Sequence, residues 1–123
     1  MKNVSTDKAP KAVGPYSQAV VSGNLIFVSG QLGTDESGAV AGDVKTQTEN
    51  AVKNLSEVLI AAGSSLSGVV KTTCFLADIG DFSSFNEIYG KFFTKKPARS
   101  LIEAAALPKG ALVEIEAIAE IKE

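Results

Sequence analysis

Hydrophobic and polar residues alternate in short runs along the chain, and the first clear pair of runs predicts a β-hairpin. In residues 19–30, AVVSGNLIFVSG, two runs rich in Val, Ile and Phe flank Ser22-Gly23-Asn24. A short glycine-containing turn between two such runs is typical of a hairpin. The stretch that follows, LGTDESGAVAGD, is polar and rich in glycine, which predicts a loop.

Two later segments have the three- and four-residue spacing of amphipathic helices. In the first, Asp43 is suited to the N-cap and Gly63 to the C-terminal stop. Its apolar positions are Val44, Ala51, Val52, Leu55, Val58, Leu59 and Ala62. In the second helix, residues 81–93, Asp81 is expected to be the cap. Its broad apolar face holds Phe82, Phe85, Ile88, Tyr89, Phe92 and Phe93.

The order of the elements indicates an α+β fold. A β-branched, nearly continuous apolar run at residues 68–78 predicts a strand between the two helices. Two amphipathic helices need a sheet to cover, so we expect a two-layer sandwich with both helices on one face of one sheet. The length of 123 residues fits a single domain spanning residues 1–123.

Residues 97–121 predict a second hairpin, around a Pro108-Lys109 turn. In that register Arg99 lies opposite Ile118 and Leu101 opposite Glu116, and cross-strand partners share a face. One face is then expected to mix charged and aliphatic residues: Arg99, Leu101, Glu103, Glu114, Glu116 and Ile118. The helices are expected to cover the other face, which holds Ser100, Ile102, Ala104, Val113, Ile115, Ala117 and Ala119.

The mixed face suggests contact with another chain. A solvent-facing sheet surface is mostly polar, so aliphatic residues among charges favour a subunit interface, although a wet face with scattered aliphatic residues is the alternative. Arg99 and Glu114 would be roughly 13 Å apart along the hairpin. If both act on one ligand, they must come from different chains. An arginine near carboxylates is typical of a carboxylate-binding site, and equally of a structural ion pair.

Composition excludes several kinds of chemistry. The sequence has no histidine and one cysteine, Cys74, which excludes Ser-His and Cys-His pairs and histidine zinc sites. Cys74 is interpreted as a small buried hydrophobic residue. The net charge of −2 and the lack of a basic stripe argue against nucleic-acid partners. No apolar run is long enough to span a bilayer, and no secretory signal is recognised. We therefore expect a cytoplasmic protein without a membrane or nucleic-acid partner.

Four segments resemble the RidA/YjgF family, the reactive intermediate deaminases. They are GPYSQAV at 14–20, IFVSGQLG at 26–33, DFSSFNEIYGKFF at 81–93 and PARSLIEAAALPKGALVEIEAIA at 97–119. The resemblance covers essentially the whole chain. It implies a chorismate-mutase-like fold and a homotrimer whose sheets form a central barrel, with ligand clefts between subunits.

The resemblance also implies hydrolysis of 2-imino acids, such as 2-iminobutanoate and 2-iminopropanoate, to 2-oxo acids and ammonia, without a metal or organic cofactor. Arg99 would bind the substrate carboxylate. Glu114 would hold and polarise the attacking water, and the Tyr16 hydroxyl would help to orient it. The remaining implied substrate-binding positions are Ser29 and Gly30, next to the imine nitrogen, together with Asn86 and Leu101.

The sequence differs from the family pattern at Leu101, and it leaves alternatives open for the water-binding residue and for the function. Many members have cysteine where this chain has Leu101, so thiol chemistry at that position is lost and a more apolar cleft is expected. Glu116 is the alternative to Glu114 as the water-binding residue. The first alternative function is a small-carboxylate-binding or regulatory module of the same fold. The second is an endoribonuclease or translation inhibitor, which the acidic charge and the absence of histidine disfavour.

Overall fold

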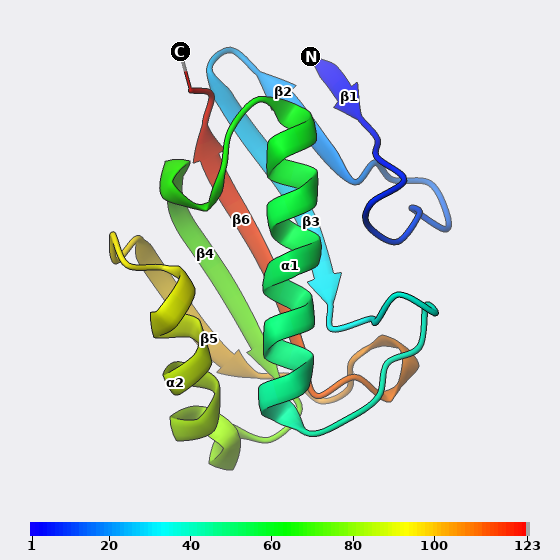
Figure 1. Cartoon of the computed structure of the whole chain (residues 1–123), viewed down its shortest axis with the longest axis vertical. Coiled ribbons are helices and arrows are strands. Elements are labelled where there is room, and N and C mark those ends of the chain that lie inside the picture. Colours follow the sequence, from blue (N-terminus) through cyan, green and yellow to red (C-terminus); the bar gives the residue numbers. More distant parts are fainter. Residues whose placement is uncertain (123) are drawn as a thin grey trace.

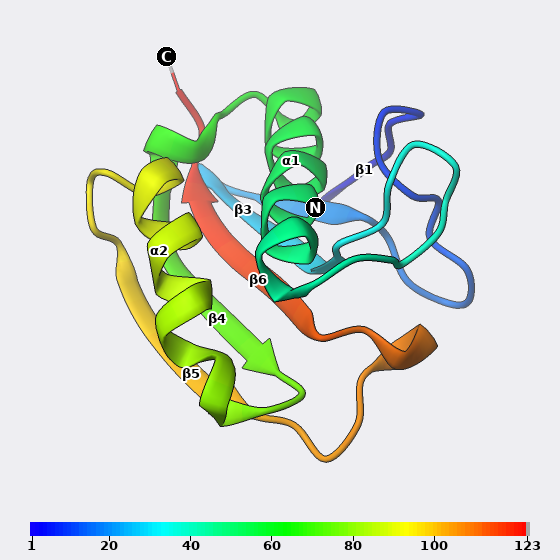
Figure 2. The same ribbon diagram turned by 60° about the horizontal axis from the view of Figure 1, so that its bottom comes forward.

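The computed structural model describes residues 1–122, which form one six-stranded sheet with two helices against one face (Figure 1). The strands are β1 (Lys2–Val4), β2 (Ala19–Ser22), β3 (Leu25–Leu32), β4 (Val69–Leu76), β5 (Ala98–Glu103) and β6 (Val113–Glu120), and the helices are α1 (Val44–Ala62) and α2 (Phe82–Phe92). Their order across the sheet is β1-β2-β3-β6-β4-β5. Figure 2 shows both helices on the same side of the sheet. The predicted α+β arrangement of one sheet and two helices is confirmed.

The first hairpin forms as predicted. Ser22 of β2 pairs with Leu25 of β3 across a two-residue turn in which Gly23 has a φ of +63°. A positive φ suits glycine because it has no Cβ to clash with the backbone. Two features were not predicted: β1 pairs with β2 at the sheet edge, and Thr34 forms an isolated bridge with Val40 inside the predicted loop.

Helix α1 begins and ends where its sequence indicates. The Asp43 side chain accepts a hydrogen bond from the backbone N–H of Thr46 at 2.9 Å. At the other end Gly63 is left-handed, with φ +97°, and its N–H bonds to the carbonyl of Ile60. The predicted apolar positions are buried up to Leu59, and Ala62 is partly buried. The caps and the apolar stripe therefore agree in placing α1 on the sheet.

Asp81 occupies the N-cap position of α2, as predicted, but its side chain makes no capping hydrogen bond. The chain enters α2 through a 3-10 turn, Ile79–Asp81, and it is Asp78 that accepts a hydrogen bond from the N–H of Gly80 at 2.8 Å. The side-chain cap therefore belongs to the 3-10 turn, three residues before the N-cap of α2.

The predicted pairing of the last two strands is also wrong. β4 lies between them: it pairs in parallel with β5 on one side and antiparallel with β6 on the other. β5 ends at Glu103 and β6 begins at Val113, so the connection is too long for a two-residue turn. The helix α2 returns the chain to the start of the sheet, so β5 pairs with β4 in parallel, and β5 forms the edge of the sheet.

This topology reverses the predicted faces of β5 but keeps those of β6. On β6, Val113, Ile115, Ala117 and Ala119 are buried. Arg99 pairs with the buried Thr72 and Leu101 with the buried Cys74, so both face the helices. Ile102 pairs with Phe75 and is 51% exposed on the open face. The expectation that Arg99, Leu101 and Glu103 share a face with Glu114 and Glu116 is therefore contradicted.

The hydrophobic core lies between the sheet and the helices. Its largest fully buried side chains include Ile26, Leu55, Leu59, Leu76, Phe85 and Ile115. Neither helix in the described chain is long and apolar enough to cross a membrane.

Candidate functional site

Arg99, the only arginine in the sequence, projects from the edge strand β5 onto one face of α2. Its Nη1 donates a hydrogen bond to Asn86 Oδ1 at 2.7 Å. The guanidinium carbon lies 4.9 Å from the ring centre of Tyr89 and 5.9 Å from that of Phe82. Both distances are within the range of a cation–π interaction. The predicted site residues Arg99 and Asn86 are therefore in direct contact.

Arg99 has no carboxylate partner in the described chain. The ion pair found within residues 1–122 joins Lys45 to Glu87, on the two helices. Arg99 is only partly exposed, and a guanidinium held in that way normally meets an anion or several acceptors. The interpretation of Arg99 as a structural ion-pair residue is therefore not supported within one chain. Its unused N–H groups suit an external carboxylate.

Glu114 lies on the open face of the sheet, on β6, and its side chain packs onto Gly30 of β3. A Cβ atom built on Gly30 would lie 2.2 Å from Glu114 Oε2. The register of β3 and β6 shifts between Val28 and Gln31, so Gly30 lies where the pairing of the two strands is irregular. Burial raises the pKa of the Glu114 carboxyl above its ordinary value, and the nearby Glu116 raises it further. The carboxylate is thus partly desolvated, and it occupies the space that a side chain at residue 30 would fill.

Ser29 joins the segment that carries Tyr16 to the middle of β3. Its Oγ donates to the carbonyl of Ser17 at 2.6 Å, and its backbone N–H donates to the carbonyl of Gln18 at 2.9 Å. Tyr16 itself is 55% exposed. Ser29, Gly30 and Glu114 therefore lie near the loop of Tyr16, at the opposite side of the sheet from Arg99.

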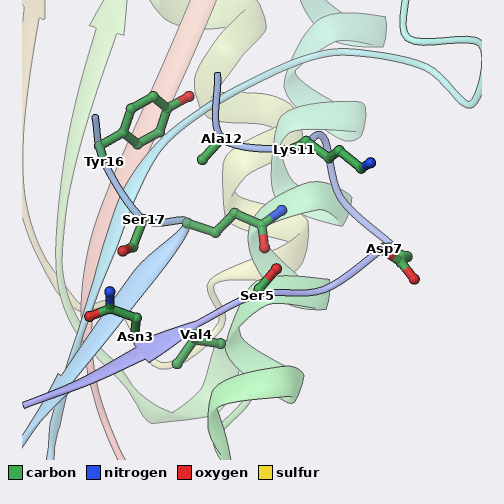
Figure 3. Close-up of a pocket in the computed structure, with 9 residues that line it drawn as sticks. Asn3, Val4, Ser5, Asp7, Lys11, Ala12, Tyr16 and Ser17 are labelled. Carbon is green, nitrogen blue, oxygen red and sulfur yellow. The ribbon is translucent and has the colours of Figure 1, made fainter. Parts of the chain in front are cut away.

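A shallow hollow of about 310 Å³ lies beside Tyr16 (Figure 3). Figure 3 shows Tyr16 and Ala12 along one rim and Asn3, Val4 and Ser5 along the other. The buried Gln18 lines it and uses its amide to bind the backbone of Thr6 and Pro10. Neither Arg99 nor Glu114 lines this hollow, so the hollow does not contain the full set of predicted site residues.

One chain does not bring the predicted site residues together. Arg99 pairs with Thr72 of β4, and Glu114 pairs with Phe75, three residues further along the same strand. From the rise and spacing of strands, the two Cα atoms are roughly 14 Å apart. Their side chains also leave opposite faces of the sheet. The residues form an Arg99 group, with Asn86 and Leu101, and a Glu114 group: Tyr16, Ser29, Gly30 and Glu114.

Comparison with known proteins identifies the family. Residues 6–121 match the family described as Endoribonuclease L-PSP. The chain belongs to this family, which is the RidA/YjgF family. The human 2-iminobutanoate/2-iminopropanoate deaminase is 51% identical over 119 residues, which are 94% of this chain and 87% of the human protein. A Lactococcus lactis protein named as a candidate regulator, AldR, is 50% identical over 125 residues and 99% of each chain.

A solved member of the RidA/YjgF family confirms the fold. The crystal structure of RidA from the Antarctic bacterium Psychrobacter sp. PAMC 21119 superposes with a TM-score of 0.94 at 45% identity. The match covers 98% of this chain and 100% of that one. The family resemblance of the four sequence segments is therefore confirmed, and relatives at about 50% identity bear the imine deaminase name.

In this RidA/YjgF chain, two features bear on whether a thiol or a metal ion could act at the site. Cys74 is buried, and burial raises the pKa of its thiol to about 11, which keeps it neutral and agrees with its interpretation as a small hydrophobic residue. Within residues 1–122, no three acidic, cysteine or histidine side chains gather as they would around a metal ion.

Sequence reasoning missed the aromatic surroundings of Arg99. Phe82 and Tyr89 were assigned to an apolar helix face, yet both lie against the guanidinium. Asn86 lies four residues after Phe82, and Tyr89 lies three residues after Asn86. This spacing places all three residues on one face of α2. The sequence shows this spacing, but it does not show that β5 lies beside α2. The predicted hairpin put Arg99 on the face of the sheet away from the helices.

Proposed function

We propose that the protein hydrolyses 2-imino acids, such as 2-iminobutanoate and 2-iminopropanoate, to 2-oxo acids and ammonia. The observation that carries this proposal is the half-buried Arg99, which has N–H groups to offer and no carboxylate partner in the described chain. A planar, permanently charged guanidinium is suited to bidentate binding of a carboxylate. The name of the human relative supports the reaction class.

In the proposed reaction, water adds to the imine carbon and ammonia leaves, so the C=N bond is replaced by C=O. Glu114 would accept a proton from the water as it attacks, and would return a proton to the departing nitrogen. Partial desolvation makes this carboxylate a better proton acceptor, in keeping with its raised pKa. Tyr16 would orient the water, and the backbone at Ser29 and Gly30 would face the nitrogen. The imine is already electrophilic, so positioning and charge can suffice.

We further propose that the protein is a homotrimer of barrel-forming, chorismate-mutase-like subunits. Each site would combine the Arg99 group of one subunit with the Glu114 group of the next. The separation of these groups within one chain supports a shared site. The open face supports burial against other copies, since it presents Phe27, 43% exposed, and Ile102, 51% exposed, among charged residues such as Lys71 and Glu116.

A coupled assay tests the enzyme proposal. Threonine dehydratase and threonine supply the enamine that tautomerises to 2-iminobutanoate, and release of 2-oxobutanoate is followed in the presence and absence of the protein. We expect faster release with the unaltered protein and no acceleration with Arg99→Ala. Equal rates with the protein and with buffer would contradict the enzyme proposal.

A carboxylate-binding or regulatory module is the second candidate. The 50% identity to the candidate regulator AldR favours keeping it, because Arg99 would bind a carboxylate in either case. Binding of 2-oxobutanoate without any acceleration of imine hydrolysis would support this candidate. The endoribonuclease name of the family is less well supported here, because the chain is acidic and has no histidine.

A further inference from the structure

The stripe Phe82, Asn86 and Tyr89 on α2 forms a support for the side chain of Arg99. The three residues follow one another at intervals of four and three, so they share one face of the helix. All three reach the guanidinium: Asn86 through a hydrogen bond and the two rings through their π-systems. Tyr89 is the nearer ring, with 4.9 Å between its centre and the guanidinium carbon.

This contact restricts how an anion can approach Arg99. The guanidinium carbon lies over the ring of Tyr89, 4.9 Å from its centre, and Asn86 Oδ1 accepts a hydrogen bond from Nη1. The N–H groups that remain lie in the guanidinium plane. An anion therefore has to approach along the edge, and a carboxylate can then accept two parallel hydrogen bonds.

Tyr89 is itself held in place by buried contacts. Its hydroxyl is hydrogen bonded to Thr72 Oγ1 at 2.7 Å, and Thr72 is fully buried on β4, between β6 and β5. Its ring stacks on Phe93 with 4.4 Å between centres and lies 5.4 Å from Phe85. Burial raises the pKa of the Tyr89 phenol, so the phenol stays neutral and does not compete with a ligand for the charge of Arg99.

We propose that Tyr89 is a positioning residue, which fixes the plane of the Arg99 guanidinium so that its free edge can take the substrate carboxylate. The hydrogen bond to Thr72 holds the ring against β4, and the ring in turn orients Arg99. This inference rests on the proposed function, since it assigns the support of the carboxylate anchor in that same site.

The test compares three substitutions, two at Tyr89 of α2 and one at Phe93, directly after the helix, by calorimetric titration with 2-oxobutanoate. Tyr89→Leu removes the π-face, and we expect the dissociation constant to rise roughly threefold to thirtyfold, the range of a cation–π contact. Tyr89→Phe keeps the ring but loses the hydrogen bond to Thr72, so it should lose some affinity, but less than Tyr89→Leu. Phe93→Leu is the matched control, because Phe93 is buried in the same aromatic cluster but is not among the rings over the guanidinium.

The separate effects on KM and kcat distinguish a positioning role of Tyr89 from a merely structural one. Tyr89→Leu should raise KM and leave kcat within about threefold, because the contact acts on binding in the ground state and the transition state alike. Light scattering and thermal unfolding monitor assembly and folding. If Tyr89→Leu does not fold, Tyr89→Met replaces it, since methionine fills irregular core space.

The outcomes separate this inference from the proposed function. If the unaltered protein neither binds 2-oxobutanoate nor accelerates imine hydrolysis, the proposed function is wrong. If it binds and Arg99→Ala does not, but Tyr89→Leu binds like the unaltered protein, only the positioning role of Tyr89 is wrong. An equal loss of 2-oxobutanoate affinity in Phe93→Leu and Tyr89→Leu would show a general packing effect, and it would also overturn the positioning role of Tyr89.

Discussion

The carboxylate of Glu114 lies against Gly30, where any larger residue would displace it. A Cβ at Gly30 would be 2.2 Å from Oε2 and 2.7 Å from the carboxyl carbon of Glu114. The resemblance had assigned Gly30 to close approach of the imine nitrogen. The structure adds a second reason for glycine at this position, because the absent side chain makes room for the proposed water-binding group.

Gly30→Ala should therefore reduce imine hydrolysis more than it reduces stability. We expect a loss of roughly tenfold to a hundredfold, since a misplacement of about 1 Å can have that effect. The obstructing atoms belong to the flexible end of a side chain, so the free energy of unfolding should fall by only about 1 kcal/mol, the lower end of the cost of overpacking. The coupled assay and thermal unfolding measure the two effects.

Gly90→Ala is the matched control for Gly30→Ala. Apart from its chain neighbours and the nearby backbone of α2, nothing lies within 4 Å of a Cβ at Gly90, which is exposed. Hydrolysis should be unchanged, and the helix should gain about 0.5–1 kcal/mol from the better helix former. Full activity in Gly30→Ala would mean that the observed position of the Glu114 carboxylate is unimportant.

Glu114→Gln should reduce turnover and leave ligand binding nearly unchanged. Glutamine keeps the size of the side chain but loses the charge and becomes a hydrogen-bond donor as well as an acceptor. We expect imine hydrolysis to fall by roughly 10² or more, as for other acid–base groups. Affinity for 2-oxobutanoate, measured by calorimetry, should stay close to that of the unaltered protein.

Glu116→Gln controls for the nearby charge on the same face of β6. Its turnover at neutral pH should remain within a few-fold of the unaltered protein. A large loss in Glu116→Gln with none in Glu114→Gln would assign the water to Glu116 instead.

The acid limb of the pH–rate profile should report the environment of Glu114. Burial raises the pKa of this carboxyl above 4.5, and Glu116 adds to the effect. The proposed base must be ionised, so kcat/KM should decline as the pH falls through a value above 4.5. Removing the charge in Glu116→Gln should move this limb to lower pH. A limb that stays in place in Glu116→Gln would show that the charge of residue 116 does not act on the titrating group.

Mixing two inactive variants tests whether each site is shared between subunits. Arg99→Ala and Glu114→Gln are denatured together and refolded. If one chain supplies Arg99 and its neighbour Glu114, random mixed trimers should contain about one intact site in four. The assay should then recover roughly a quarter of the unaltered activity. A mixture as inactive as its components, although light scattering shows trimers, would contradict the shared site.

The sequence by itself determined the local structure and the identity of the candidate groups. The two-residue turn at Gly23, the Asp43 and Gly63 caps and the apolar spacing of α1 depend on interactions between near neighbours in the chain. The alternation along β6 was also predicted correctly, because side chains of one strand point to opposite faces with a period of two. The family motifs indicated Arg99, Glu114, Tyr16 and Gly30.

Only the tertiary structure decided which strands are neighbours and hence which side chains meet. Alternation shows which residues share a face of one strand, but it does not name the strand beside it, since pairing joins segments that are distant in the chain. β4 separates β5 from β6, so Arg99 faces α2 and Glu114 faces the open side. The contact between Tyr89 and Arg99 and that between Gly30 and Glu114 both follow from this non-local pairing.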